Sequence, residues 1–198
     1  ESGKLNLEPQ SLNLVTFCKD LTVDYEALCQ QKNIIFHFLP SRTIIRVEFD
    51  PEKMEILLSN LISNAFKYTP EGGKIVLSID ETDEKVTLVV EDNGIGIQKE
   101  FQEVIFDRFF QIENTEIFST GDGIGLSFVK HLVELHDGTI RVESELNKGA
   151  KFIVELPKKE RVDEPVSSEE EIIIVPKSVK ENMLVVTESA SSPAAPHT

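Results

Sequence analysis

Two asparagines, a lysine and a tyrosine interrupt an otherwise apolar stretch at residues 54–69. Asn60 and Asn64 are four residues apart, and Lys67 and Tyr68 follow Asn64 at three and four. In a helix this spacing places all four side chains on one side. Amide, ammonium and phenol groups gathered in this way can bind a polar ligand. For this stretch considered alone, a surface helix with a solvated polar face is the simpler explanation.

A second polar motif comes at the end of a predicted strand, where Asp92 is followed by Gly94, Gly96 and Ile97. The aspartate offers a carboxylate acceptor, and the glycines offer backbone that a planar ligand can approach closely. The glycines would also let the following segment swing. Asp-x-Gly-x-Gly alone is a weak pattern, more often an ordinary turn.

A third motif, Gly121, Gly123 and Gly125 followed by Leu126, opens a helical pattern. Unpaired amides and the dipole at a helix N-terminus bind phosphate, although the pattern also occurs as a plain structural turn. A dinucleotide-binding fold would need the glycines directly after its first strand, followed by a crossover to a parallel strand. Here a long irregular segment precedes them and a predicted hairpin follows.

That irregular segment runs from about residue 98 to residue 122 and contains Phe-Asp-Arg-Phe-Phe at residues 106–110, with Arg108 in the middle. A long irregular connection inside a compact domain is usually functional, most often as a lid. We therefore expect a lid between the second and third motifs.

The elements that must position these motifs alternate between helices and strand pairs. Apolar spacing predicts a helix at residues 13–32 with Ser11 as its N-cap, and Asp50-Pro51-Glu52 is a strong start for the central helix. Strands are predicted at 34–39 and 44–49, joined by a tight loop, and hairpins at 74–80 with 85–91 and at 139–145 with 150–156. His37 is expected to be a partly exposed strand residue. The order predicts an α+β fold, a two-layer sandwich with helices on one face of a mixed, mostly antiparallel sheet.

Composition limits the partners. The chain has 198 residues, 40% of them hydrophobic, and a net charge of −15. One domain with an appendage is therefore expected, and the negative charge argues against nucleic acid or an anionic membrane surface as the main partner. A phosphate ligand would need a divalent cation or a few placed basic residues. Cys18 and Cys29 lack metal-ligand spacing and are expected to pack in the core of a protein from a reducing compartment. There is no initiating Met, so we expect Glu1 to begin an excerpt of a longer protein.

The composition changes after Pro157, where Lys, Glu, Ser, Pro and Ala dominate and Glu169, Glu170 and Glu171 form an acidic run. This predicts a linker or tail. An apolar run at residues 172–175 resembles a strand that could pair with an exposed sheet edge.

In this order, the motifs resemble the nucleotide-binding domain of sensor histidine kinases, within the superfamily that includes the Hsp90, MutL and gyrase ATPases. The resemblance covers roughly residues 14–156 and comprises an asparagine box at 60–69, a first glycine box at 92–97, a phenylalanine box at 106–110 and a second glycine box at 121–126. It implies the Bergerat ATP-binding fold. We expect residues 1–12 to end a preceding dimerisation helix or linker, 13–157 to form the ATP-binding domain, and 158–198 to form the tail.

The resemblance implies ATP and Mg²⁺ as cofactors. Asn64 would coordinate Mg²⁺ with the ATP phosphates, supported by Asn60, and Lys67 would neutralise phosphate charge, which makes Asn64 and Lys67 the implied catalytic pair. Tyr68 would pack on adenine, and Asp92 would accept a hydrogen bond from the adenine amino group. Nucleotide contacts are implied in addition for Gly94, Gly96, Ile97, Arg108, Gly121, Gly123, Gly125 and Leu126.

This sequence departs from its relatives at two positions. MutL and gyrase carry a glutamate that activates water one helical turn before the Mg²⁺ asparagine, and here that position is Asn60. A general base for hydrolysis is therefore missing, which favours phosphoryl transfer to a protein acceptor and makes the anti-sigma serine kinases less fitting. Ala150 follows Gly149 where many kinases have a hydroxyl residue that helps to fix adenine, so we expect that contact to be absent.

The resemblance also implies partners. The family phosphorylates a histidine on a dimeric helical hairpin, and neither His37, His131, His136 nor His197 has the sequence context of that histidine. The hairpin of the same protein is therefore an expected partner, as is a downstream receiver domain or a separate response regulator, since the tail resembles the linker of hybrid two-component proteins. We expect a homodimeric parent protein, a monomeric fragment and a cytoplasmic domain, with inner-membrane anchoring of the parent left open. The alternative is a regulatory nucleotide-binding module that transfers no phosphoryl group.

Overall fold

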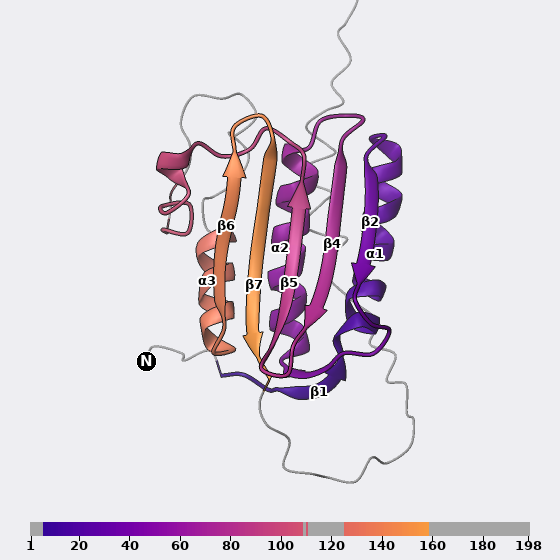
Figure 1. The fold of residues 1–198 in the computed structure, drawn as a ribbon, viewed down its shortest axis with the longest axis vertical. Helices are drawn as coiled ribbons and strands as arrows, with labels where there is room; N and C mark the ends of the chain where they lie inside the picture. Colours follow the sequence, from indigo (N-terminus) through magenta and orange to yellow (C-terminus); the bar gives the residue numbers. More distant parts are fainter. Residues whose placement is uncertain (1–5, 109, 111–124, 159–198) are drawn as a thin grey trace, which may run out of the picture.

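The computed structural model describes residues 6–108, 110 and 125–158, which form a five-stranded sheet, a two-stranded sheet and three α-helices (Figure 1). No helix in these ranges is both long and apolar enough to cross a membrane. In chain order the elements are β1 (Gln10–Asn13), α1 (Leu14–Gln31), β2 (Ile35–Pro40), β3 (Arg46–Phe49), α2 (Pro51–Tyr68), β4 (Lys74–Glu81), β5 (Lys85–Asp92), the 3₁₀ helix η1 (Lys99–Phe101), α3 (Gly125–Leu135), β6 (Thr139–Glu145) and β7 (Gly149–Pro157).

The large sheet has the strand order β2-β4-β5-β7-β6. β2 runs parallel to β4, and the other neighbouring pairs are antiparallel. The three helices cover one face of this sheet (Figure 1). The predicted α+β sandwich with a mixed, mostly antiparallel sheet is therefore confirmed, as are both predicted hairpins, β4 with β5 and β6 with β7.

The strands on either side of the loop at Pro40 and Ser41 belong to different sheets. β2 pairs with β4, whereas β3 pairs with β1 in the two-stranded sheet, with Gln10 opposite Phe49. His37 is exposed on β2, as expected. The predicted N-cap of α1 was wrong, because Ser11 lies within β1. The cap is Asn13, whose side chain accepts hydrogen bonds from the N–H groups of Val15 and Ile45.

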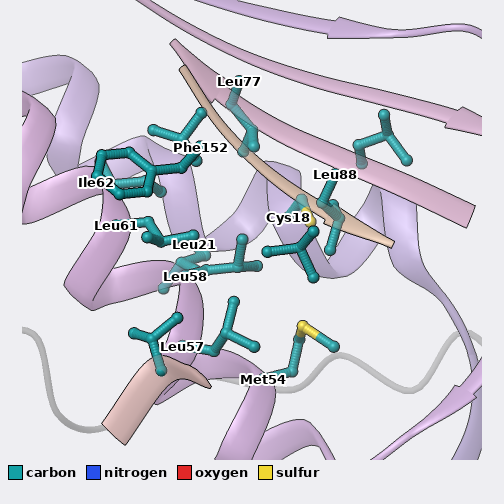
Figure 2. Packing of buried hydrophobic residues seen from close by; sticks show 14 of the residues in the cluster. Cys18, Leu21, Met54, Leu57, Leu58, Leu61, Ile62, Leu77, Leu88 and Phe152 are labelled. Carbon is teal, nitrogen blue, oxygen red and sulfur yellow. The ribbon is translucent and has the colours of Figure 1, made fainter. Parts of the chain in front are cut away.

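One apolar core lies between the helices and the large sheet (Figure 2). Its members recur every three or four residues on the helices and at every second residue on the strands, which is the spacing that places side chains on one face. Burying each large aliphatic side chain contributes about 1.5–3 kcal/mol. Cys18 and Cys29 are buried and free, as predicted, and burial raises the pKa of both thiols. The fully buried positions include Leu14, Met54, Leu57, Leu58, Ile62, Ile75, Leu77 and Leu88.

Both ends of α2 are fixed by polar contacts. Asp50 is the predicted N-cap and accepts a hydrogen bond from Lys53 N–H at 3.1 Å, and Pro51 occupies the first turn. At the other end, Lys32 Nζ from beyond α1 donates to the carbonyl oxygens of Phe66 at 3.1 Å and Thr69 at 2.9 Å. A lysine here satisfies carbonyl groups that the helix leaves unpaired. The helix that carries the asparagines is therefore held at both ends.

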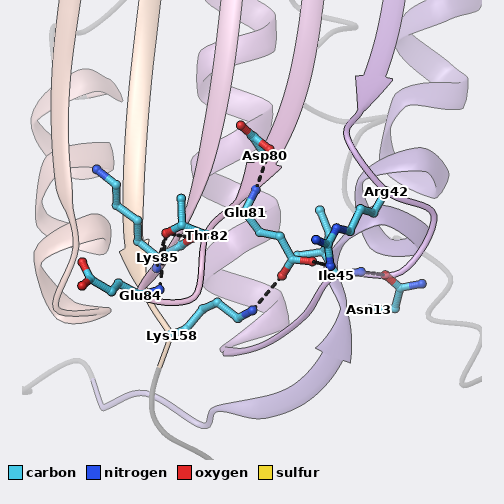
Figure 3. A network of polar contacts seen from close by, with 9 residues as sticks. All are labelled: Asn13, Arg42, Ile45, Asp80, Glu81, Thr82, Glu84, Lys85 and Lys158. Carbon is cyan, nitrogen blue, oxygen red and sulfur yellow. Dashed lines mark hydrogen bonds and ion pairs between the residues drawn. The ribbon is translucent and has the colours of Figure 1, made fainter.

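The sheet end away from the asparagine box is tied together by ion pairs (Figure 3). Glu81, at the end of β4, contacts Lys158 Nζ at 2.7 Å and Arg42 at 3.3 Å. Lys158 also donates its backbone N–H to the Glu84 carbonyl oxygen at 2.8 Å. These contacts hold the start of the stretch after β7 against the β4–β5 hairpin.

Candidate nucleotide-binding site

The predicted helix carries Asn60, Asn64, Lys67 and Tyr68 on α2, where all four are half-buried. The Asn60 amide donates to the carbonyl oxygen of Ile56 at 2.8 Å. Its Oδ1 faces the first residue of α3, where a Cβ on Gly125 would lie only 2.8 Å away. A larger residue at position 125 would require the Asn60 side chain to shift. The helix N-terminus that carries Gly125 and half-buried Leu126 therefore meets the asparagine box, which brings the end of the second glycine box to the first motif.

Lys67 and Tyr68 lie next to each other at the end of α2. The Lys67 ammonium nitrogen is 5.1 Å from the centre of the Tyr68 ring, a cation–π distance. Burial lowers the pKa of Lys67 and raises that of Tyr68, because both charged forms lose water. The pair places a cation and an aromatic face side by side, a combination that suits an anionic ligand with a planar ring.

The first glycine box packs directly on the end of α2. Ile95 N–H donates to the Tyr68 carbonyl oxygen at 3.3 Å, and a Cβ on Gly94 would lie 2.2 Å from that same oxygen. Gly96 has φ +67°, and a Cβ there would lie 2.1 Å from the Glu145 carbonyl oxygen. We predicted these glycines from ligand approach and lid movement. The structure gives them another reason, because each closely approaches the protein's own backbone.

Asp92 ends β5 and is 7% exposed. Its carboxylate accepts hydrogen bonds from the N–H groups of Gly94, at 2.8 Å, and of Ala150. Burial raises the pKa of Asp92 to about 6; these hydrogen bonds oppose the shift and Glu91 adds to it. The group is thus a largely ionised acceptor at neutral pH. Ala150 contacts the Asp92 carboxylate with its backbone N–H alone. Many kinases have a hydroxyl side chain at this position, and alanine lacks it.

The phenylalanine box borders the start of the predicted lid. Phe106 packs edge-on against Phe152 of β7, with ring centres 6.4 Å apart, and Phe110 contacts Phe101 at 5.7 Å. Arg108 is exposed in this segment. The structure thus ties the box to the sheet but gives no contact that tests Arg108 as a phosphate ligand. Gly121 and Gly123, with most of the predicted lid, lie outside the described residues.

Three residues near the site were not singled out from the sequence as supports of the first glycine box. Ser144 and Gln102 hydrogen-bond to it, and Gly149, with φ +99°, would place a Cβ 1.9 Å from the Asp92 carbonyl oxygen. A lone serine or glutamine carries no sequence signal of this kind. The spacing Asn147-Lys148-Gly149 does signal a turn with positive φ, and Asn147 and Gly149 both have it.

A nucleotide would fit the groups that these motifs bring together. A buried carboxylate acceptor, an aromatic ring, an ammonium group and a helix N-terminus are the features that bind adenine and phosphates. Within residues 6–108, 110 and 125–158, no group of three or more His, Cys, Asp or Glu side chains could hold a metal ion. A cation here would depend on amide and phosphate oxygens.

Comparison with known proteins supplies an independent finding. The model of a family described as "Histidine kinase-, DNA gyrase B-, and HSP90-like ATPase" matches residues 49–160. The chain is 37% identical over 161 residues to histidine kinase P4 of Formosa agariphila. That alignment covers 79% of this chain and 12% of the relative, so the chain spans only a small part of such a protein.

Solved structures are similar to this chain over about three quarters of its length. The catalytic domain of histidine kinase ThkA is 33% identical, with a TM-score of 0.69, and the match covers 77% of this chain and 99% of that domain. A structure of ThkA in complex with the response regulator protein TrrA is 31% identical, with a TM-score of 0.65, over 76% of this chain and 42% of that one. These two structures and the family model agree with the motifs found in the sequence.

Proposed function

This chain belongs to the histidine kinase-, DNA gyrase B- and HSP90-like ATPase family, as a catalytic domain of the histidine kinase type, and from that premise we propose that it binds ATP with Mg²⁺ beside α2 and passes the γ-phosphoryl group to a histidine on a separate helical hairpin. The observation that carries the proposal is the buried Asp92 carboxylate at the end of β5, held by the backbone N–H groups of Gly94 and Ala150. When bound, Mg·ATP supplies the phosphoryl group and neutralises part of the phosphate charge.

The residues of this chain bind and orient the nucleotide. Asp92 accepts a hydrogen bond from the adenine amino group, and the Tyr68 ring packs on the adenine. Lys67 holds an ammonium group beside that ring, where it meets phosphate charge. Asn64 contributes an amide oxygen to Mg²⁺. Catalysis of this kind is positioning and charge neutralisation, with little covalent work by the domain.

Asn60 decides between transfer and hydrolysis. Its amide donates to the Ile56 carbonyl oxygen, and an amide has no basic site with which to take a proton from water. A water molecule beside the nucleotide therefore lacks a base at this position. Phosphoryl transfer to a protein acceptor is favoured over ATP hydrolysis.

Substitution of Asn64 tests the cation site. We expect Asn64→Asp to weaken Mg²⁺-dependent ATP binding about tenfold or more, because the added negative charge lies near the phosphates. Calorimetric titration with ATP, in the presence and absence of Mg²⁺, measures this. Unchanged affinity in Asn64→Asp would contradict the assignment.

The rival function is a regulatory module that binds nucleotide without phosphoryl transfer. Incubating the chain with γ-labelled ATP and the separately produced hairpin of the same protein distinguishes the two, since only a kinase domain labels the hairpin. A matched hairpin with its histidine replaced by alanine is the control. Label on the unchanged hairpin alone supports transfer, and no label despite ATP binding supports the rival.

The same proposal includes the partners and setting. We propose that the parent is a homodimer, that this fragment is a monomer in the cytoplasm, and that a receiver domain or response regulator accepts the phosphoryl group from the hairpin. The ThkA complex with a response regulator protein supports the last point for a relative. The boundaries at residues 13 and 157 and the role of residues 172–175 stay predictions.

A further inference from the structure

Ser144 of β6 and Gln102, just after η1, hydrogen-bond to Ile97 at the end of the first glycine box. We propose that they are positioning residues, a hydrogen-bonded clamp that fixes the Asp92 carboxylate relative to the segment leading into the phenylalanine box. This role rests on the proposed function, because its purpose is to hold the adenine acceptor in place. Neither residue belongs to the motifs by which the family is identified in this chain.

The Ser144 hydroxyl links two backbone segments. It accepts a hydrogen bond from Ile97 N–H at 2.8 Å and donates one to the Gly149 carbonyl oxygen at 2.6 Å. Both distances lie within the ordinary range for bonds of their type. One hydroxyl group therefore connects the end of the first glycine box to the start of β7.

The start of β7 in turn holds Asp92. Gly149 lies so close that a Cβ there would be 1.9 Å from the Asp92 carbonyl oxygen, and Ala150 N–H donates to the Asp92 carboxylate. A shift of the Gly149 carbonyl group would consequently move the donor that orients the carboxylate. Ser144 thus acts on Asp92 through Gly149 and Ala150.

Gln102 adds two further hydrogen bonds to this clamp. Its amide nitrogen donates to the carbonyl oxygens of Ile97 at 3.0 Å and of Ser144 at 2.7 Å, which uses both of its hydrogens. Gln102 lies four residues before Phe106 in the chain. Gln102 therefore joins the end of the first glycine box to β6, at the residue whose hydroxyl group reaches β7.

The test uses the unchanged chain, Ser144→Ala, Gln102→Ala and the conservative variant Ser144→Thr, with Ser78→Ala as the matched control. Ser78 is a half-buried strand serine on β4 of the same sheet. Calorimetric titration gives the dissociation constants of Mg·ATP and Mg·GTP for each. GTP is the informative probe because guanine lacks the adenine amino group that Asp92 would bind.

We expect Ser144→Ala to weaken ATP binding about tenfold and to reduce the preference for ATP over GTP by a similar factor. The reason is that a misplaced Asp92 weakens the binding of ATP but not the binding of GTP. Gln102→Ala is expected to do the same by about threefold, and it keeps the inference testable if Ser144→Ala fails to fold. Ser144→Thr keeps the hydroxyl group and is expected to restore both values, and Ser78→Ala to change neither.

A purely structural role would lower the folded fraction and weaken both nucleotides equally. An unchanged preference in both clamp variants would therefore overturn the inference while leaving ATP binding intact. Failure of the unchanged chain to bind ATP would overturn the proposed function and, with it, the inference. The two failures are thus distinguishable in one set of titrations.

Discussion

Two aspartates in the described part of the chain are almost fully buried, and they differ in what surrounds them. Asp50, before α2, is 2% exposed and Asp92, at the end of β5, is 7% exposed. Each accepts two backbone N–H groups, from Glu8 and Lys53 in one case and from Gly94 and Ala150 in the other. Only Asp50 has a cation beside it in the described structure, the Lys53 ammonium group at 3.4 Å.

The difference shows in the pKa of each group. Burial raises both, but at Asp50 the two hydrogen bonds and Lys53 outweigh burial and the pKa falls below its usual value. At Asp92 burial dominates and the pKa rises to about 6. The Asp50 carboxylate is compensated by Lys53 and caps a helix. Within the described residues the Asp92 carboxylate has no such cation beside it, so it can still accept a hydrogen bond from a ligand. This difference supports a structural role for Asp50 and the binding role that we propose for Asp92.

Replacing Asp50 with Ala is expected to have the largest effect on stability, about 3 to 4 kcal/mol at pH 7. The change removes the N-cap of α2 and leaves the Glu8 and Lys53 N–H groups without their acceptor. Denaturant unfolding followed by circular dichroism measures it. Asp24→Ala on the exposed face of α1 is the control and should stay within about 0.5 kcal/mol. Equal losses of unfolding free energy in Asp50→Ala and Asp24→Ala would contradict the structural role of Asp50.

Asp92→Asn is expected to change stability in a pH-dependent way. Because its folded pKa is raised, Asp92 favours folding fully below its ordinary pKa of 3.8, and that contribution is lost as pH rises through about 6. The unfolding free energy of the unchanged chain relative to Asp92→Asn should therefore fall by about 2 kcal/mol between pH 4 and pH 7. Parallel denaturant titrations across this range measure the difference. A flat difference would mean that the carboxylate is not held at a raised pKa.

Lys53→Met removes the cation beside Asp50 and so gives Asp50 surroundings more like those of Asp92. We expect a loss of about 1–2 kcal/mol at pH 7, because the ammonium group leaves while the aliphatic part of the side chain is kept. The sign of the pH dependence is opposite to that of Asp92. The contribution is present above pH 4 and lost as pH falls through the lowered pKa of Asp50. A loss that persists unchanged at pH 2.5 would assign the effect to packing.

The sequence predicted the elements that local chemistry specifies. The Asp50-Pro51-Glu52 start, the polar side of α2 and both hairpins carry strong local signals, and all are present. The separation of β2 and β3 into two sheets was not predicted, because the parallel pairing of β2 with β4 joins residues about 40 apart and depends on the rest of the fold.

Only part of the site could be predicted from the sequence, because some of its residues carry a local signal and others do not. Asn60, Asp92 and Gly125 carry motif signals, and the structure brings them to neighbouring elements. Ser144 and Gln102 contact the glycine box through hydrogen bonds to backbone groups, which many residue types at many spacings can make. The reason for Gly94 and Gly96 was also hidden, since contact with the Tyr68 and Glu145 carbonyl oxygens exists only in the folded chain.

Calorimetric titration of the unchanged chain and Asp92→Asn with Mg·ATP at pH 7.5 tests whether Asp92 is the nucleotide acceptor. We expect the unchanged chain to bind Mg·ATP and Asp92→Asn to bind it about 100-fold more weakly, because an amide can turn its NH₂ group toward the adenine amino group, which removes the acceptor. Equal dissociation constants for the two proteins would contradict the assignment of Asp92 as the nucleotide acceptor.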